Sequence, residues 1–392
     1  MKRNLLFLSV LLLTLSCSNR SKEKNHAVQV IHVDVSVAPQ KIDLEDVTEN
    51  ISFIRLETNS NCLIKSINKV EIYKSRIYIL ESSAFRNLLC FNLQGKFLFK
   101  VSGVGQGPGE YQFLTDFTID KENGCLLLAD NFRKIMKFDL EGNYVETYKT
   151  DLAINNIYLV DEKENIMAIR GYSAQRDNHY SFVTYSLKDQ SILYYKSSDY
   201  VNIISSIGSN VFSQSKNGIL YSEPFNDTLF YVTKAGMEPC YIIDFGKYTF
   251  PIKEYKNEQL RSLIMQFNNS DKKYAGLISN SYESSKCLFF GYDFSGKGLL
   301  AIYSTEADKT VSINEIIIKG NSYSKIQAFF KMQQDGTFIA ELPAELVSNE
   351  DIFMKESQRE GYGSYTDITN LTIREDDNPI LILGELNFDR LF

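Results

Sequence analysis

A repeat of about 47 residues constrains the fold of this chain more than any other feature of its sequence. Residues 85–98 read FRNLLCFNLQGKFL and residues 132–145 read FRKIMKFDLEGNYV, so Phe, Arg, Phe, Leu and Gly recur 47 residues apart. Segments around Tyr185 and Tyr231 continue the same register. A period of this length is typical of a β-propeller blade or of a solenoid unit.

The secondary structure within each repeat decides between these two architectures. Short apolar runs alternate with turn sequences, as in FTID, ENG and CLLLAD, which predicts hairpins in series. Helical periodicity is nearly absent from residues 51–250, which excludes helical solenoids. We therefore predict an all-β chain, a six-bladed β-propeller of four-stranded antiparallel blades. Five blades are expected at residues 65–102, 111–150, 154–198, 203–246 and 279–318.

The sixth blade is predicted to combine residues 326–342 with the C-terminal sequence NPILILGEL and an N-terminal strand. Such a blade would join the two ends of the chain and hide its edge strands. Two short helical insertions are also expected, at residues 253–268 and 343–358. In the first of these, apolar residues recur at helical spacing, as on a helix packed against the rest of the molecule.

The N-terminus has the pattern of a secretory signal. Lys2 and Arg3 precede an apolar run, residues 5–15, and Cys17 follows it. This run is shorter than the roughly 20 residues of a membrane-spanning helix. The cysteine position resembles the lipobox of bacterial lipoproteins, although Thr14 stands where that pattern prefers leucine. Simple secretion with an unmodified cysteine is the alternative.

These signals divide the chain into three parts. We predict a lipoprotein signal peptide at residues 1–16, a polar tether at 17–27 with lipidated Cys17 at its start, and a single six-bladed propeller domain at 28–392. The expected location is the cell envelope, as an outer-membrane lipoprotein. Surface-export signals that follow a lipidated cysteine resemble short acidic runs, and the tether has no such run. We therefore expect the domain on the periplasmic face of the outer membrane and not on the cell surface.

Charge and cysteine content narrow the function classes. The formal net charge is -7, and basic stripes are missing, so nucleic acid is not expected as a partner. Apart from Cys17, five widely spaced cysteines stand alone without a CxxC pair, which argues against a disulfide framework or a structural zinc site. We interpret these five as buried apolar residues.

Residues 103–145 carry further motifs: a glycine-rich lead-in, GVGQGPGEY, an Asp before a Gly turn, Ala129-Asp130 at a strand end, and Phe138-Asp139 with Gly142. This stretch resembles an NHL repeat. The whole chain from residue 50 to 390 is similar to the six-bladed β-propeller lipoproteins of bacterial envelopes (TolB-like propellers). The resemblance implies the fold and an envelope location, but this fold hosts binding modules and enzymes alike.

The predicted propeller places one set of loops on the face that such folds use for ligands. The candidate binding residues on this face are Arg86, Glu110, Tyr111, Arg133, Arg176, His179, Asn226 and Asp227. Arg86 and Arg133 recur at the repeat period, so they are interpreted either as structural partners of carboxylates between blades or as an anion-attracting rim.

Catalytic and metal sites receive less support. His179 is the one histidine beyond the N-terminal segment, which disfavours a zinc lyase site. Calcium needs only carboxylates and amides, which Glu110, Asp116, Asp177 and Asp227 could supply, but no spacing singles them out. We therefore predict no cofactor, with calcium kept as the alternative.

Together these patterns favour a monomeric, envelope-anchored module that binds a protein, peptide or glycan and contacts the membrane only through its lipid anchor. The alternative is a lactonase-like propeller hydrolase or lyase with a metal or carboxylate site in the central channel. A purely structural role in the envelope is the third reading. The sequence favours a binding function over catalysis, and the enzyme is kept as the alternative.

Overall fold

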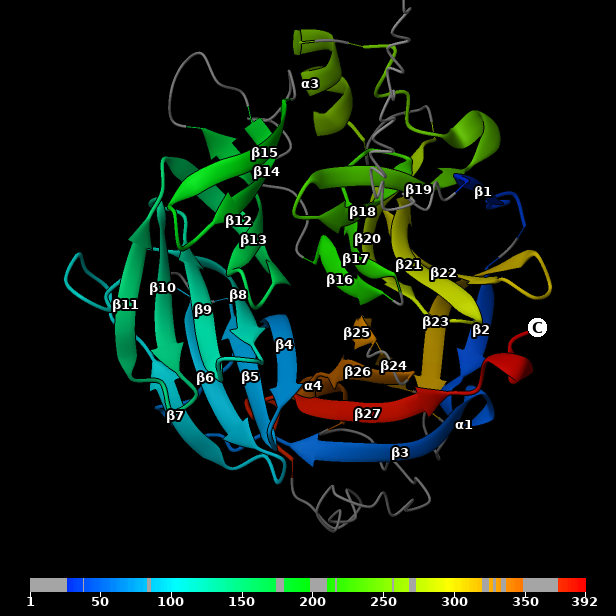
Figure 1. Cartoon of the computed structure of the whole chain (residues 1–392). Helices are drawn as coiled ribbons and strands as arrows, with labels where there is room; N and C mark the ends of the chain where they lie inside the picture. The colour runs from blue at the N-terminus through cyan, green and yellow to red at the C-terminus, as the bar shows by residue number, and fades with distance from the viewer. Residues whose placement is uncertain are drawn as a thin grey trace, which may run out of the picture.

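The structure is a computed structural model (Figure 1). It describes residues 27–37, 39–82, 86–173, 180–197, 210–215, 217–255, 257–267, 273–318, 324–326, 329–332, 336–347 and 373–392. Sheets of antiparallel strands lie around a common centre (Figure 1). The predicted signal peptide, lipidation site Cys17 and the tether up to residue 26 lie outside the described residues.

Three separate four-stranded antiparallel sheets follow one another along the chain. The first contains β4 (Ile67–Tyr73), β5 (Arg76–Glu81), β6 (Asn87–Asn92) and β7 (Phe97–Val101). The second contains β8 (Leu114–Asp120), β9 (Cys125–Asp130), β10 (Lys134–Asp139) and β11 (Tyr144–Lys149). The third contains β12 (Leu152–Asp161), β13 (Ile166–Ser173), β14 (Tyr180–Ser186) and β15 (Ser191–Ser197). In each sheet the strands pair in chain order.

The repeated glycines of the sequence lie in the turns between third and fourth strands. Gly95 and Gly142 have φ angles of 75° and 86°, a left-handed conformation that strains residues with a Cβ. A Cβ on Gly95 would lie 1.9 Å from the carbonyl oxygen of Arg55, and one on Gly142 would lie 2.5 Å from Cδ2 of Phe99. Both close approaches are to a neighbouring sheet, so turn geometry and packing between sheets require the repeated glycine.

The largest sheet has eleven strands. Its middle consists of two four-stranded antiparallel units. The first is β16 (Phe212–Ser215), β17 (Gly218–Ser222), β18 (Thr228–Thr233) and β19 (Gly236–Asp244). The second is β20 (Ala275–Glu283), β21 (Cys287–Phe294), β22 (Lys297–Ser304) and β23 (Lys309–Ile318). A parallel pairing of β16 with β20, at Ser215 and Glu283, joins the two units.

Two N-terminal strands extend this large sheet. β1 (Gln29–His32) pairs in parallel with the outer strand β19, and β2 (Gln40–Asp43) pairs in parallel with β23. β24 (Ser324–Ile326) also pairs with β23. The N-terminal segment therefore crosses the outer edges of both units that form the sheet.

The last sheet joins the two ends of the chain. It contains β25 (Phe329–Met332), β26 (Thr337–Leu342), β27 (Ile380–Leu386) and β3 (Thr48–Arg55), in that order. β27 pairs antiparallel with β3, with Ile380 opposite Arg55. The predicted combination of the C-terminal strand, an N-terminal strand and the segment before residue 342 is confirmed.

The all-β class and the four-stranded antiparallel units are confirmed, whereas a closed six-bladed propeller is not shown. The sheets are not closed into a propeller, and two units share one mixed sheet that also holds two N-terminal strands. The sequence repeat predicts pairing within a unit. It carries no signal for backbone pairing between units, because the strands involved lie outside one repeat.

Burial follows the position of each strand within its unit. All six residues of β9 are buried, whereas the outer strand β11 is exposed or half-buried throughout. A strand covered on both faces reads as a continuous apolar run, which explains the CLLLAD sequence of β9. The five described cysteines are free and buried, and burial raises the pKa of Cys90 to about 12.

The helices are short. α3 (Asn257–Met265) confirms the first predicted insertion, and its Leu260 and Ile264 pack with Phe267 against Phe225 and Phe250. α4 (Ala344–Val347) begins where the second insertion was predicted, but residues 348–358 lie outside the described part. α1 (Leu44–Val47), η1 (Gly246–Tyr248) and η3 (Phe388–Arg390) are single turns. None of the helices in the described ranges has the length and apolar character that a membrane crossing requires.

Candidate functional site

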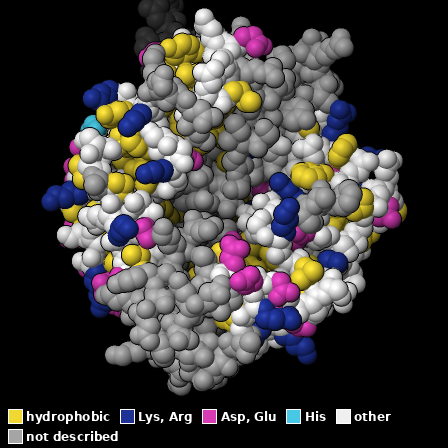
Figure 2. Space-filling model, turned by 180° about the vertical axis from the view of Figure 1, so that it is seen from behind, with side chains coloured by type: hydrophobic (Ala, Val, Ile, Leu, Met, Phe, Trp, Pro, Cys, Tyr) yellow, Lys and Arg dark blue, Asp and Glu magenta, His cyan; other side chains and the backbone are white. Residues whose placement is uncertain are grey.

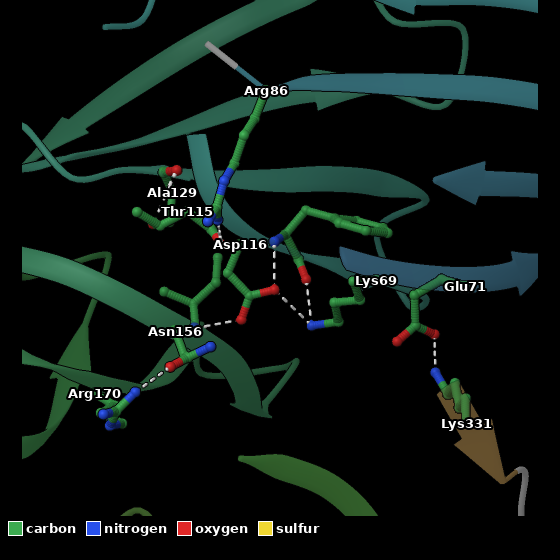
Figure 3. Close-up of polar contacts among 11 residues, drawn as sticks. Lys69, Glu71, Arg86, Thr115, Asp116, Ala129, Asn156, Arg170 and Lys331 are labelled. Atoms are coloured by element: carbon green, nitrogen blue, oxygen red, sulfur yellow. Dashed lines mark hydrogen bonds and ion pairs between the residues drawn. The ribbon is translucent and has the colours of Figure 1, made fainter. Parts of the chain in front are cut away.

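The inner strands of the sheets surround a cavity of about 620 Å³. Its wall includes residues of six strands, β4, β8, β12, β16, β20 and β25, each of which is an end strand of its four-stranded unit in the order of pairing. The described lining includes five charged side chains: Lys69, Glu71, Lys121, Glu162 and Lys331. Figure 3 shows how two of the lysines meet their acidic partners.

Backbone irregularities place three polar residues of neighbouring sheets at equivalent positions. The pairing register shifts just before Lys69 in β4, before Asp116 in β8 and before Asn156 in β12. A β-bulge redirects the side chains that follow it, and such bulges occur often beside functional sites. Lys69 and Asp116 are 47 residues apart, so the repeat visible in the sequence also relates these two positions.

Asp116 connects three successive sheets. Its Oδ1 accepts hydrogen bonds from Lys69 Nζ and from the backbone N–H of Phe117, both at 2.8 Å. Its Oδ2 accepts a hydrogen bond of 3.0 Å from the backbone N–H of Ile157, on β12. Lys69 also donates to the carbonyl oxygen of Phe117 at 2.7 Å. The carboxylate is therefore occupied by structural contacts, which Figure 3 shows together.

A second ion pair links the first sheet to the last. Lys331 on β25 is bonded to Glu71 on β4 (Figure 3). Burial alone would raise the pKa of Glu71, but the ammonium groups of Lys331, Lys69 and Lys121 outweigh it and hold that pKa below its ordinary value. Burial also lowers the pKa of Lys331, and Glu71 offsets this only in part. Three lysines thus gather around one carboxylate.

The rim of the cavity carries opposite charges on two neighbouring sheets. Lys121 follows β8 and is exposed, and its ammonium group has no partner among the described residues. Glu162 follows β12 and accepts a 2.8 Å hydrogen bond from the backbone N–H of Glu122. Tyr158 also lines the cavity, and its pKa is raised by burial and by the charges of Glu71 and Glu162.

The wall formed by β16 and β20 carries uncharged polar side chains together with Phe212 and Tyr282. Asn210, Ser213, Gln214, Asn280 and Ser281 line it. Asn280 Oδ1 and Ser281 Oγ are buried and have no hydrogen-bond partner within the described part of the chain. Buried polar atoms in proteins are nearly always bonded to protein, water or ligand, so these two atoms mark a place for a polar partner.

Two buried charged groups on strands around the cavity make hydrogen bonds within the protein. Arg170 is 3% exposed and donates a 2.9 Å hydrogen bond to Asn156 Oδ1. Glu283 is 1% exposed and accepts hydrogen bonds of 2.6, 2.7 and 2.7 Å from Ser215 Oγ, Tyr231 Oη and Tyr241 Oη. Such buried hydrogen bonds help to orient the strands that carry the cavity wall.

None of the sequence-predicted candidates that the structure describes lines the cavity. Arg86 lies 4.7 Å above the Phe113 ring and donates to the carbonyl oxygen of Thr115 at 3.2 Å. Tyr111 is 0% exposed and its hydroxyl donates to the carbonyl oxygen of Arg86 at 2.9 Å. Both side chains therefore hold neighbouring segments together.

The other candidates occupy turns or lie outside the described part. Glu110 accepts the backbone N–H of Gly107, Arg133 is exposed, Asn226 donates to Glu223, and Asp227 pairs with Lys253 at 3.5 Å. Arg176 and His179, like Asp177 of the calcium alternative, are outside the described residues. Arg86 and Arg133 share positive φ angles of 55° and 65°. Their repetition thus corresponds to a shared turn conformation.

Sequence reasoning missed the cavity lysines. Lys69 had a usable signal, since it lies one repeat before Asp116. Lys121 and Lys331 had none, because a single lysine in or after a strand is typical of a solvated position. Within the described residues, no three His, Cys, Asp or Glu side chains lie close enough together to hold a metal ion.

Comparison with known proteins identifies the family. The profile of the domain of unknown function DUF4934 matches residues 28–385. The chain belongs to this family. The NHL-repeat propeller lipoprotein family suggested by sequence resemblance is therefore wrong as an assignment. The motifs behind that resemblance describe strands and glycine turns, which unrelated all-β repeats also contain.

Solved structures resemble this DUF4934 chain over most of its length. A protein described as “Putative exported protein”, from Bacteroides fragilis NCTC 9343, is 18% identical, with a TM-score of 0.68, covering 92% of this chain and 99% of its own. A member of the DUF4221 family from Bacteroides vulgatus ATCC 8482 is 9% identical, with a TM-score of 0.50, covering 86% and 96%. At these identities the likeness shows the fold alone. No curated protein matches the sequence.

Proposed function

We propose that this DUF4934 chain is a binding protein that holds a small polar ligand in the cavity between its inner strands. The observation that carries the proposal is the cavity itself, about 620 Å³ in volume and lined by charged and polar side chains of six strands. Ligand pockets in proteins commonly have volumes of roughly 300–1,000 Å³. A wall made of strands from different sheets is also rigid, which favours a preformed site.

The unsatisfied groups in the wall support a ligand rather than a packing defect. Asn280 Oδ1 and Ser281 Oγ are buried and have no hydrogen-bond partner among the described residues. An apolar residue at either position would avoid the cost of an unpaired buried polar group, which is about 1–3 kcal/mol. The exposed Lys121 has no side-chain partner among these residues either. A polar ligand would complete their hydrogen bonds.

Binding is favoured over hydrolase or lyase chemistry by the state of the acidic groups. Asp116 is bound to Lys69 and two backbone N–H groups, and Glu71 is bound to Lys331. A general acid or base must be available to the substrate. The visible face in Figure 2 carries interspersed positive and negative side chains, which supports the expectation that nucleic acid is not the partner.

We further propose that the chain is exported and anchored by lipidated Cys17, with its domain on the periplasmic side of an outer membrane. The signal pattern of residues 1–17 and the description of the B. fragilis protein as exported support this proposal. Fractionation with protease treatment of intact cells tests it. Digestion of the domain in intact cells would contradict the periplasmic side, and Cys17→Ser should release the protein from membranes.

Ligand screening of the purified chain tests the binding function. We expect at least one compound from a panel of sugars, amino acids and carboxylic acids to raise the melting temperature, since a ligand that binds only the native state stabilises it. Hydrogen exchange then locates the site. Protection should increase in β4, β8, β12, β16, β20 and β25, with the outer strands β7, β11 and β15 as the internal control.

Two outcomes would overturn the binding function. One is the absence of stabilisation by every compound at millimolar concentration. The other is protection confined to outer strands or turns, which would move the site away from the cavity.

A further inference from the structure

The cavity has two chemically different walls. On one side, Lys69 and Glu71 of β4, Lys121 after β8 and Lys331 of β25 approach one another closely enough that all three lysines affect the titration of Glu71. Lys69 is paired with Asp116, and Lys331 is paired with Glu71, so these four charges cancel. Lys121 has no ion-pair partner within the described ranges, and Glu162 is the remaining carboxylate of the lining.

The opposite wall has the groups that bind hydroxyls. Amide side chains of Asn210, Gln214 and Asn280 and hydroxyl groups of Ser213 and Ser281 lie on or beside β16 and β20. Ser281 is 4% exposed and its Oγ lacks a hydrogen-bond partner in the described part of the chain. Amides and hydroxyls both donate and accept, so they match the hydroxyl groups of a ligand.

From these two walls we infer that the ligand is a small organic acid bearing several hydroxyl groups, of which a uronic acid is the simplest form. Its carboxylate lies against Lys121 on the cationic wall, and its hydroxyl groups bond to the wall of β16 and β20. This inference rests on the proposed binding function and adds the chemical class of the ligand.

Of the two acids that line the cavity, Glu71 is neutralised by its contact with Lys331. Glu162 is a second carboxylate, which accepts the backbone N–H of Glu122 at 2.8 Å. A hydrogen bond between an ammonium and a carboxylate is roughly twice as strong as one between neutral groups. The carboxylate therefore gains more from Lys121 than a neutral hydroxyl does.

Calorimetric titration of the full chain with matched ligand pairs tests the inference. The pairs are glucuronate with glucose, galacturonate with galactose, and gluconate with glucitol, and succinate serves as an acid without hydroxyl groups. We expect at least one acid to bind about tenfold more tightly than its neutral partner, as one charge-assisted contact implies. Succinate should bind more weakly than that acid, and added salt should weaken acid binding.

Two substitutions assign the groups, with Lys188→Gln as the matched control on an exposed turn outside the cavity. Lys121→Gln should weaken binding of the acid about tenfold and leave the neutral partner unchanged. Ser281→Ala should weaken the acid and its neutral partner by the same factor. Unfolding of a variant would weaken the binding of both ligands, so it does not explain a loss that is confined to the acid. A thermal melt of each variant checks that the variant is folded.

The outcomes separate this inference from the function on which it rests. If neutral sugars bind as tightly as their acids, or if Lys121→Gln leaves acid binding unchanged, the acidic ligand class is wrong while a binding cavity stands. If no hydroxylated acid binds but other compounds of the wider panel do, the proposed ligand class is wrong while the binding function stands. If no compound of either panel binds, both fall.

Discussion

The first three sheets and the eleven-stranded sheet solve the same packing problem in different ways. Among β4 to β15, the sheets stay separate, and side chains such as Asp116 bridge one inner strand to the next. In the large sheet, backbone pairing itself joins two units at Ser215 and Glu283, and the N-terminal strands β1 and β2 cover their outer edges.

The comparison shows that units with similar sequence patterns can be connected to their neighbours by different kinds of contact. A side-chain bridge depends on one or two residues and on complete hydrogen bonding of a buried charge. A backbone joint depends on register and on the apolar contacts that support it. The two regions should therefore fail through different substitutions, which the following predictions exploit.

The largest effect is expected for Asp116→Ala. This change removes three hydrogen bonds and leaves Lys69, whose side chain is only 12% exposed, without its carboxylate. Breaking one partner of such a pair costs about 3–5 kcal/mol of unfolding free energy. Denaturant unfolding measures it, with Glu146→Ala in the exposed Lys137 pair as control. A cost below about 1 kcal/mol would mean that the bridge is unimportant.

Ile31→Ala tests whether the N-terminal strand is integral to the large sheet. Ile31 on β1 is 0% exposed and packs in the same core cluster as Leu288 and Phe290. Truncating a buried isoleucine costs about 2–4 kcal/mol. The adjacent Val30, which is 47% exposed, provides the control, and Val30→Ala should change the unfolding free energy little. If both substitutions change the unfolding free energy equally little, β1 does not contribute to the stability of the large sheet.

Ser215→Ala tests the joint between the two units of the large sheet. Ser215 Oγ donates to the buried carboxylate of Glu283 at 2.6 Å, and losing a hydrogen bond to a charged group costs about 2 kcal/mol. Ser281→Ala removes a hydroxyl that has no partner within the described residues, so its cost should stay below about 0.5 kcal/mol. Chemical unfolding of both variants gives the contrast, and equal costs would contradict it.

A smaller effect, with a defined pH dependence, is expected at Glu341 in the sheet that joins the chain ends. Burial raises the pKa of Glu341 to about 7. The native state then keeps the proton that the unfolded chain releases above its ordinary pKa of 4.5. Stability contributed by this group therefore falls as pH rises from about 4.5 to 7 and stays lost above it.

Glu341→Gln should remove this loss. At pH 8 the variant should be more stable than the wild type by about 1 kcal/mol, a value reduced for the partial exposure of the group. At pH 4 the two should be equal, because the carboxyl is protonated in both states. Thermal or denaturant unfolding across this pH range checks the crossover, and a constant difference at every pH would refute the assignment.

The sequence predicted what lies within one repeat. The runs FTID and CLLLAD became β8 and β9, and the repeated glycines became left-handed turns, because hairpins depend on residues close in the chain. It did not predict that β1 and β2 pair in parallel with β19 and β23. Those strands have four residues each, and their partners lie more than two hundred residues away.

The site was harder to predict for a related physical reason. The cavity chemistry arises where inner strands of different sheets meet, as when Lys331 of the last sheet contacts Glu71 of the first. Neither residue carries a local pattern that points to the other. The turn residues that did stand out, Arg86 and Tyr111, hold neighbouring segments together instead.

The pairing of N-terminal strands with late partners also determines the order in which the chain can fold. β1, β2 and β3 are the first strands to leave the ribosome, yet their partners are β19, β23 and β27. Contacts this distant form slowly. The pairing of β1, β2 and β3 can therefore be completed only after β27, close to the end of the chain, has been synthesised.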